Sequence, residues 1–586
     1  MTSAAPTERS EHRPTSFSKS LFFGVIPEEM VFPYPRPPEA EREGVRLVLE
    51  AWHKFAAEKV DSPKIDADAA IPKPVLQELK ALGLFGLAIP EAYGGAGLTA
   101  TGYARVFQEV AAVDGSLAVT LGAHQSIGCK GIVLFGSEAQ KKKYLPRCAS
   151  GEWVAAFALT EPSSGSDAAS IKTRAVRQPD GSFRLSGNKI WISNGGFADV
   201  FTVFAQTEVE KGGQKKDRIS AFIVERAFGL KTGKEEHKLG IRGSSTTAVY
   251  LEDVPVPAEN LLGQVGGGFK VAMEVLNNGR LGLAAGCVGA ARTLIKLAVG
   301  HATARRQFGR PISEFGLVKD KIARMMTETY AAESMVYLTT GLIDAGAPDY
   351  SIESACCKVF ASEMLWRLAN ESLQISAGAG YMKEYPYERL LRDARINLIF
   401  EGTNEILRLF IALSGMSEPG ERLAKLAAVI REPVKAYGLL IDYVVHKVRT
   451  SSTFGEHLDR PHGLLKKEAV MIEDSVRDVA AAVEKVLRKH GRRIVEMQYT
   501  QRRVADLTID LYGMIACLSR ASSALEAQGE ARAEREVKLA KAFTGQAFGR
   551  IRRTLKQFDN NDDELLKSIA DDAYEMSAYP FDAALA

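Results

Sequence analysis

The sequence predicts a mostly helical α+β protein with one β domain between helical domains, and three observations lead to this fold class. The chain has 586 residues, more than a single hydrophobic core usually serves. Apolar residues recur at three- and four-residue steps before residue 154 and after residue 262, which is the period of a helix. Between these positions they form short β-branched and aromatic runs separated by Gly, Asp, Lys and Pro, as strands do.

Individual segments support each part of this plan. Residues 79–90 have apolar side chains at helical spacing and end at a proline. Residues 117–136 are nearly all apolar or small, which predicts a helix buried on most sides. Residues 199–209 and 246–257 have the composition of strands. We therefore expect an extended N-terminal arm (1–40), an N-terminal helical domain (41–153), a β-barrel or sandwich (154–262), a helical bundle (263–415) and an extra helical domain (416–586).

Composition excludes several classes of protein. Hydrophobic residues make up 46% and charged residues 25% of the chain, which is typical of a soluble globular protein. A formal net charge of +3 argues against a nucleic-acid partner held by overall electrostatics. We find no apolar run of the roughly 18 residues that a membrane span requires. The six cysteines have no CxxC spacing, which indicates that they are reduced thiols. We expect no metal site.

The N-terminal residues bear on location. They lack the apolar core of a secretory signal, and Glu8 and Glu11 argue against a transit peptide. We expect a bacterial cytoplasmic protein, with inner-membrane association as an option, or a processed protein of the mitochondrial matrix.

Two polar clusters lie in the predicted β domain. Residues 157–167 (FALTEPSSGSD) offer hydroxyl and backbone N–H donors in a tight turn that can wrap a polyanion or a polar ring edge. The alternative is a solvated loop. Residues 189–196 (KIWISNGG) place Trp191 beside a hydroxyl, a pair that can stack on a flat cofactor and bind its edge. The alternative is a tryptophan of the core.

Two further clusters lie in the predicted helical bundle. Arg280 and Arg305 fall on predicted helices with apolar neighbours, where a half-buried guanidinium needs a carboxylate, a phosphate or a carbonyl. A structural ion pair is the alternative. Glu401 follows Leu398, Ile399 and Phe400, and a carboxylate in apolar surroundings has a raised pKa and can act as a base. An acid at a helix N-terminus is the alternative.

Together and in this order, the clusters resemble the acyl-CoA dehydrogenase family. TEPSSGSD (160–167) is similar to one family signature, and residues 374–393 are similar to a second, except that Ala377 stands where the family usually has Gly. The phrases TLGAHQSIGCKGI, GFKVAMEVLNNGR and IFEGTNEILRLFIALSGM, with the length of the chain, resemble the very-long-chain branch, which has an extra C-terminal domain.

The resemblance implies site residues for the cofactor FAD and for an acyl-CoA substrate, with Glu401 as the catalytic base. Arg305 and Gln307 would reach the FAD of a neighbouring subunit. The implied substrate contacts are Ser166, Asn277, Arg280, Phe400, Gly402 and Gly122. The implied FAD contacts are Phe157, Leu159, Thr160, Gly165, Ser166, Trp191, Ile192, Ser193, Arg305, Gln307, Phe308, Gln374, Ile375, Ser376, Ala377, Gly378, Thr403, Asn404 and Glu405.

The resemblance also implies a reaction. Glu401 would remove the α-proton of a saturated acyl-CoA while the β-hydrogen leaves as hydride to FAD, giving a trans-2-enoyl-CoA in the first step of fatty acid β-oxidation. Some relatives place the base just before the arginine of NNGR, but here that position is Gly279, which cannot act as a base. Gly122 and Ala123 are small and would leave the acyl pocket open for long chains.

The implied partners are an electron-transfer flavoprotein and a second copy of the chain in a homodimer. Residues 443–467, which interleave basic and apolar side chains, are candidates for peripheral membrane contact. Two alternatives stay open: an acyl-CoA oxidase, in which O₂ reoxidises the flavin, and an assembly or scaffold protein with residual dehydrogenase activity.

Overall fold

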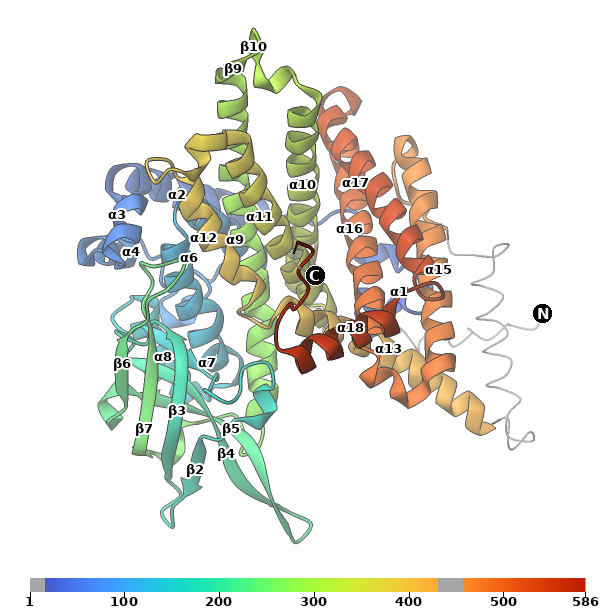
Figure 1. The fold of residues 1–586 in the computed structure, drawn as a ribbon. Coiled ribbons are helices and arrows are strands. Elements are labelled where there is room, and N and C mark those ends of the chain that lie inside the picture. The colour runs from blue at the N-terminus through green and yellow to red at the C-terminus, as the bar shows by residue number, and fades with distance from the viewer. Residues whose placement is uncertain (1–15, 430–456, 585–586) are drawn as a thin grey trace, which may run out of the picture.

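The computed structural model describes residues 16–429 and 457–584, and it has the predicted order of helices, strands and helices (Figure 1). The first helical part packs beside the sheet, except for its short first helix, which packs in the helical bundle. It comprises α1 (Phe17–Leu21), α2 (Glu39–Lys59), α3 (Ser62–Asp68), α4 (Lys73–Ala81), α5 (Ala100–Val113), α6 (Gly115–Gly122), α7 (Lys130–Phe135) and α8 (Glu138–Ala149).

The segment 117–136 is buried as predicted, but it is not a single regular helix. The Asp114 carboxylate caps α6 by accepting hydrogen bonds from the backbone N–H groups of Ser116 and Leu117. A π-helical stretch, Ala123–Cys129, then separates α6 from α7. Such π-helical insertions are frequent at functional sites.

Two helical stretches correct the expectation about apolar runs. Gly115–Phe135 and Gly268–Ala304 are each long and apolar enough to cross a membrane by length and composition. In the fold, 67% and 61% of their most apolar windows are buried inside the protein. These two stretches therefore supply core to a folded domain.

Strands β1 to β8 form one eight-stranded sheet within the described residues. Its path is β6-β7-β3-β2-β4-β5-β8, and β1 pairs in parallel with β4. The β3–β7 register shifts between Lys189 and Ile192, where Trp191 has a φ of 57°. The strands are β1 (Ala155–Ala158), β2 (Arg174–Arg177), β3 (Phe183–Ser193), β4 (Val200–Lys211), β5 (Gln214–Glu225), β6 (Lys231–Glu235), β7 (Thr246–Val256) and β8 (Leu261–Leu262).

Long helices form the rest of the molecule, and a short hairpin projects from one end of the bundle (Figure 1). The hairpin strands are β9 (Arg306–Gln307) and β10 (Arg310–Pro311). The helices are α9 (Gly268–Ala304), α10 (Gly316–Asp344), α11 (Ser351–Tyr381), α12 (Tyr387–Arg395), α13 (Asn404–Val429), α15 (Lys466–His490), α16 (Gln498–Gln528), α17 (Glu530–Lys556) and α18 (Asp563–Met576).

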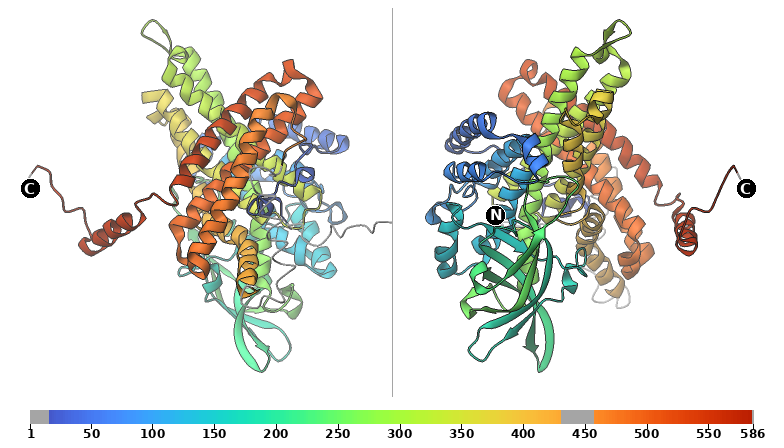
Figure 2. Two further views of the ribbon diagram at one scale, coloured as in Figure 1. Left: turned by 90° about the vertical axis from the view of Figure 1, so that its right-hand side faces the viewer. Right: turned by 60° about the vertical axis from the view of Figure 1, so that its left-hand side comes forward.

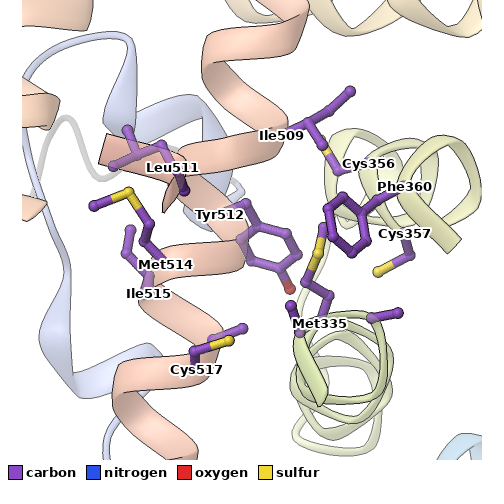
Figure 3. Close-up of a cluster of buried hydrophobic side chains, with 14 of the residues drawn as sticks. Met335, Cys356, Cys357, Phe360, Ile509, Leu511, Tyr512, Met514, Ile515 and Cys517 are labelled. Carbon is purple, nitrogen blue, oxygen red and sulfur yellow. The ribbon is translucent and has the colours of Figure 1, made fainter. Parts of the chain in front are cut away.

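The helices after residue 457 share a core with the bundle. Figure 3 shows Tyr512 of α16 between side chains of α10 and α11. The Tyr512 hydroxyl lies 2.7 Å from the Thr339 Oγ1 atom, which is also 3.2 Å from the Cys357 thiol. By contrast, α18 projects from the body and buries no side chain (Figure 2).

The described part of the N-terminal segment differs from the expected extended arm. It contains α1 and a 3-10 helix, and Phe17, Leu21 and Phe22 are buried in the bundle core. The Ser16 hydroxyl and the Ser18 backbone N–H both donate to one carboxylate oxygen of buried Glu353, at 2.8 and 2.6 Å. Burial of the apolar residues thus fixes this segment to α11.

All six cysteines are free and buried, as expected for reduced core thiols. Cys356 and Cys357 lie in the core beneath α16, where burial raises the pKa of both thiols. Because the thiolate is the reactive form, neither is suited to redox chemistry.

Candidate functional site

The Glu401 loop joins the end of the α12 region to α13. Glu401 and the following Gly402 have φ values of 59° and 91°, in the left-handed region that a residue other than glycine rarely adopts. This turn directs the Glu401 carboxylate towards Gly279 of α9. A Cβ atom at Gly279 would lie 2.6 and 2.8 Å from the two carboxylate oxygens, so the absence of a side chain there makes room for Glu401.

Two buried cations from different helices face Glu401. Arg280 of α9 donates from Nε to the Glu401 backbone carbonyl at 3.2 Å and from Nη1 to the Asn277 side-chain oxygen at 2.8 Å. Lys358 of α11 is fully buried and donates to the Gly402 carbonyl at 2.8 Å. Burial raises the pKa of Glu401 to about 7, although Arg280 and Lys358 oppose this shift. The direction of this shift agrees with the raised pKa expected from the apolar neighbours of Glu401 in the sequence.

Glu401 makes a specific pH dependence testable. Its protonated form predominates below a pKa of about 7 and cannot accept a proton, so we expect kcat/KM to rise with pH through an inflection near 7 and then level off. The effect on stability has the opposite sign: since folding raises this pKa, its contribution to stability is lost as pH rises through 7. Initial rates and Tm measured across pH 5.5–9 check both trends. A value of kcat/KM that does not change across pH 7 would contradict the assignment of Glu401 as the proton acceptor.

A cavity opens beside the Glu401 carboxylate. Its empty volume is about 940 Å³ when the open mouth is included. Gly122, Ser193 and Phe400 line it together with Gly279, so the cavity joins the N-terminal helices, the sheet and the bundle. The Glu401 Oε2 atom is buried and has no hydrogen-bond partner among the described residues. An unpaired buried acceptor at the wall of a mostly apolar cavity is suited to taking a proton from a bound ligand.

The two polar clusters of the β domain lie against each other. The backbone N–H of Ile190 donates to the Thr160 carbonyl at 3.0 Å. Fully buried Lys189 donates to the Glu161 carboxylate at 2.7 Å and to the Leu159 carbonyl at 3.1 Å. Burial lowers the pKa of Lys189 to about 8. Burial favours the neutral form of Glu161, but hydrogen bonds from Lys189 and from backbone N–H groups outweigh it and lower that pKa. This ion pair fixes one cluster to the other.

At the junction of these two clusters, residues 157–167 and 189–196, a flat aromatic group and polar donors are accessible. Trp191 is 64% exposed, so it is not a core tryptophan; its positive φ turns it out of the sheet while Ile192 is buried within. Ser166 is exposed and Thr160 half-buried, and a Cβ atom at Gly165 would meet no atom within 4 Å. Phe157 packs on Phe204 with ring centroids 5.0 Å apart, and Leu159 is buried.

The hairpin residues correct one prediction. Arg305 ends α9 rather than lying within a helix among apolar neighbours, and it is exposed, as is Gln307. Phe308 is 90% exposed and has a φ of 50°. Three exposed arginines, at positions 305, 306 and 310, lie near it in the sequence.

Residues 374–378 lie near the end of α11, at the same end of the bundle as the hairpin (Figure 1). Gln374, Ala377 and Gly378 are exposed, whereas Ile375 and Ser376 are buried. Ala377 has a φ of 51° and a ψ of −130°, a conformation that favours the glycine usual in this motif.

The three residues after Gly402 have different surroundings. The Thr403 hydroxyl accepts from the Ile406 N–H at 3.3 Å, and Glu405 is exposed. Asn404 is buried, and its side chain is hydrogen-bonded to Lys358 and Ser362. The expected cofactor contact is therefore not available to the Asn404 side chain.

Comparisons with known proteins agree with this geometry. The chain is 46% identical over 545 residues to the human very long-chain specific mitochondrial acyl-CoA dehydrogenase, which covers 92% of this chain and 83% of that protein. It matches the N-terminal, middle and C-terminal domain models of acyl-CoA dehydrogenases and the "ACAD9/ACADV, C-terminal domain" model. The matched residues are 42–152, 156–254, 266–416 and 463–579, respectively.

The chain belongs to the acyl-CoA dehydrogenase family. Among solved structures, an acyl-CoA dehydrogenase complexed with FAD from Bacillus anthracis has a TM-score of 0.78 at 32% identity and covers 96% of each chain. A chain from a structure of the electron transferring flavoprotein of Acidaminococcus fermentans has a TM-score of 0.60 at 38% identity, covering 65% of this chain and 98% of that one.

FAD is the cofactor of this acyl-CoA dehydrogenase, and the residues at the junction fit a flavin. An exposed indole, accessible hydroxyls and a glycine turn with open space are a donor set for a flat, polar-edged ring. Ser193 and Glu401 line the same cavity, so this surface and the Glu401 carboxylate border one space.

Sequence reasoning missed several residues of the site. Lys358, Lys189 and Glu161 are buried charges that hold its loops, and Tyr103 supports the cavity wall through a 2.7 Å hydrogen bond with Ser126. A lysine inside an otherwise apolar helical stretch, as in CCKVFA (356–361), was the available signal for Lys358.

Proposed function

We propose that this acyl-CoA dehydrogenase oxidises long and very long saturated acyl-CoA thioesters to trans-2-enoyl-CoA, the first step of fatty acid β-oxidation, with Glu401 as the base. The observation that carries the proposal is the unpaired, buried Glu401 oxygen at the wall of an apolar cavity. The test is to add a ladder of saturated acyl-CoAs to the purified yellow protein. Bleaching of the flavin that is strongest with long chains would support the proposal, and no bleaching with any of them would refute it.

The residues around Glu401 account for the proton transfer. A thioester α-proton is only weakly acidic, so a base must be positioned within about 3 Å of it. Arg280 holds the Glu401 carbonyl, and the glycine at 279 leaves the carboxylate free to face the cavity. The cavity walls beside the carboxylate are mostly apolar. FAD, when bound, supplies the acceptor for the β-hydrogen.

Small side chains favour a long acyl group. Ala111, Ala118, Gly122, Gly286 and Ala290 all line the cavity, and each leaves space that a larger residue would fill. A deep, apolar channel gains roughly 0.8 kcal/mol for each buried methylene of the ligand. The name of the human relative refers to very long chains, which is consistent with this inference.

Gly122→Phe is expected to shift the chain-length optimum downwards. A Cβ atom added at Gly122 would lie 3.1 Å from the Phe107 ring, and Gly122 lines the cavity, so a bulky side chain there would occupy cavity space. We expect kcat/KM to fall about 10²-fold for the longest substrates and to change little for short ones, measured over the same acyl-CoA ladder. The short substrates serve as the internal control. Equal losses at all lengths would mean that Gly122 does not face the acyl chain, and a wild-type optimum at butyryl-CoA would contradict the substrate class.

We propose an electron-transfer flavoprotein as the acceptor of the electrons. The similarity to a chain in a structure of such a flavoprotein supports this choice. The alternatives remain an oxidase and a scaffold protein with residual activity. Reduction with acyl-CoA without oxygen, followed by admission of air, separates the first two: a flavin that stays reduced in air supports the dehydrogenase.

We also propose a homodimer in which the exposed hairpin of one copy contributes to the FAD site of the other. Phe308→Ala is then expected to lower the FAD content of the purified protein severalfold, because the exposed ring would lose its contact. Flavin absorbance and mass in solution measure the outcome. Leu47→Ala, which removes an exposed side chain on α2, is the control. A fully flavinylated monomer, or a tetramer, would contradict the proposal.

Membrane contact through residues 443–467 has less support. Residues 443–456 lie outside the described residues. In the described remainder, Leu458 and Leu465 pack on the bundle core, and Arg460 donates to the Phe32 carbonyl at 2.8 Å. These three side chains are therefore not available to a membrane. Peripheral membrane attachment through the other residues of this segment stays a prediction. A cytoplasmic or matrix location also stays a prediction, and so do the domain boundaries after residues 40, 153, 262 and 415.

A further inference from the structure

A chain of polar contacts leads from the Glu401 loop to the extra helical region, and its first member is Lys358. This lysine is fully buried on α11. Its ammonium group donates to the Gly402 carbonyl and to the Asn404 side-chain oxygen, both at 2.8 Å. It therefore holds the residue directly after the base and the first residue of α13.

Asn404 is in turn hydrogen-bonded to two further residues of α11. Its amide nitrogen donates to the Ser362 hydroxyl at 3.0 Å and to the Glu363 carboxylate at 3.2 Å. The side chain of Asn404 is buried, so these bonds are made away from solvent, where a lost partner is costly.

Arg408 connects this cluster to the extra helical region. It lies on α13 and forms two bonds with Glu363, from Nη1 at 2.6 Å and from Nη2 at 3.1 Å. Its Nε atom donates to Asp506 of α16 at 2.7 Å. Nearby, α16 also packs Tyr512 against Cys357, the neighbour of Lys358 (Figure 3).

We propose that Lys358, Asn404, Glu363, Arg408 and Asp506 act as one positioning network, through which the packing of α16 on the bundle holds the Glu401 loop in its active conformation. The inference rests on the proposed role of Glu401 as the base. None of the five residues is a catalytic residue in this proposal; they act by fixing the backbone that carries one.

The backbone of the loop explains why such support is needed. Glu401 is not a glycine, yet it has a left-handed φ of 59°. A conformation of this kind is unfavourable for a residue other than glycine and persists only where the surroundings hold it. Arg280 binds the carbonyl of Glu401 from α9, and Lys358 binds that of Gly402 from α11. Removing either support frees the loop to relax and displaces the carboxylate.

The extra region thereby has a role that its distance from the cavity would not suggest. None of the residues described in this region lines the cavity beside Glu401. Through Asp506, it supplies the counter-charge that holds Arg408, and Arg408 in turn holds Glu363.

The experiment compares three holoenzyme variants: Lys358→Met, Asp506→Asn and Asp510→Asn. The third is the matched control, because Asp510 lies one turn further along α16 and pairs with Arg550 of α17 at 2.6 Å, within the extra region. We expect kcat to fall at least about 10²-fold for Lys358→Met and about 10-fold for Asp506→Asn, with KM changed less than threefold. Asp510→Asn should lower Tm as much as Asp506→Asn and leave kcat unchanged.

Two readouts exclude a general loss of structure. Lys358→Met removes a cation that lowers the pKa of Glu401, so the inflection of kcat/KM should move to higher pH. Arg280 from α9 and Tyr103 from α5 still face Glu401 in this variant. In the double variant, Asp506→Asn should add little to Lys358→Met, because residues of one network are not additive. Equal kcat values for Asp506→Asn and Asp510→Asn, or fully multiplicative effects in the double variant, would overturn the inference.

Hydrogen exchange separates failure of this inference from failure of the proposed function. Backbone amides of residues 400–406 should exchange faster in Lys358→Met and Asp506→Asn than in the wild type and Asp510→Asn, whether or not any protein turns over acyl-CoA. Unchanged exchange in both variants would overturn the network. An active Glu401→Gln enzyme would instead overturn the role of the base.

Discussion

Replacing Glu401 with Gln is expected to lower kcat at least about 10³-fold while FAD stays bound, because glutamine keeps the size of the side chain and cannot accept the proton. The fold should tolerate the change. Burial already disfavours the charged form of Glu401 and raises its pKa to about 7. Above that pH, the variant removes a buried charge, so its Tm at pH 8 should equal or exceed that of the wild type. Steady-state rates, flavin absorbance and thermal unfolding provide the three measurements.

A control carboxylate separates this effect from a change in net charge. Glu43→Gln alters an exposed residue of α2 whose ion-pair partner in the described part of the chain is Arg46, one turn away, and the kcat of this variant should match that of the wild type. Should Glu401→Gln keep more than a tenth of the wild-type rate, another group must act as the base.

Gly279→Ala is expected to reduce kcat by about 10² without unfolding the protein. The new methyl group would lie 2.6 and 2.8 Å from the Glu401 oxygens and 2.9 Å from Ile127 Cγ2, closer than such atoms can approach. The carboxylate is the flexible partner, so it moves, and a displacement of about 1 Å from the reacting atom can cost this much rate. Rates and Tm measured together distinguish a displaced base from a damaged fold.

Gly300→Ala is the matched control on the same helix. A Cβ atom there meets nothing within 4 Å, and replacing glycine by alanine inside a helix stabilises it by roughly 0.5–1 kcal/mol. Its kcat should be unchanged and its Tm slightly higher. A Gly279→Ala enzyme as active as Gly300→Ala would mean that Glu401 does not work from beside α9.

Much of the fold and part of the site could be predicted from the sequence. The order of helices and strands follows from periodicity, which is a local property of side chains. Glu401 could be selected because the residues that bury it, such as Phe400, precede it directly in the sequence. The acyl-CoA dehydrogenase motifs then predicted FAD, and the comparisons agree.

Other site features depend on residues far apart in the chain. The sequence has no local sign that Trp191 is turned outwards by a register shift in β3, or that Arg305 is exposed at the end of α9. Asn404 matches a cofactor motif, yet its side chain is occupied by Lys358, 46 positions earlier. Such partnerships form only when α11 and α13 pack together.

The sequence by itself determined the fold class, the family, the cofactor and the base candidate, because these are encoded in periodicity and in short motifs. Only the tertiary structure decided that Gly279 leaves room for the Glu401 carboxylate, that two buried cations oppose the raised pKa of Glu401, and that the extra helices share the core of the bundle. The reason is physical: burial, electrostatic interaction and steric fit depend on distances in space, which spacing along the chain does not fix.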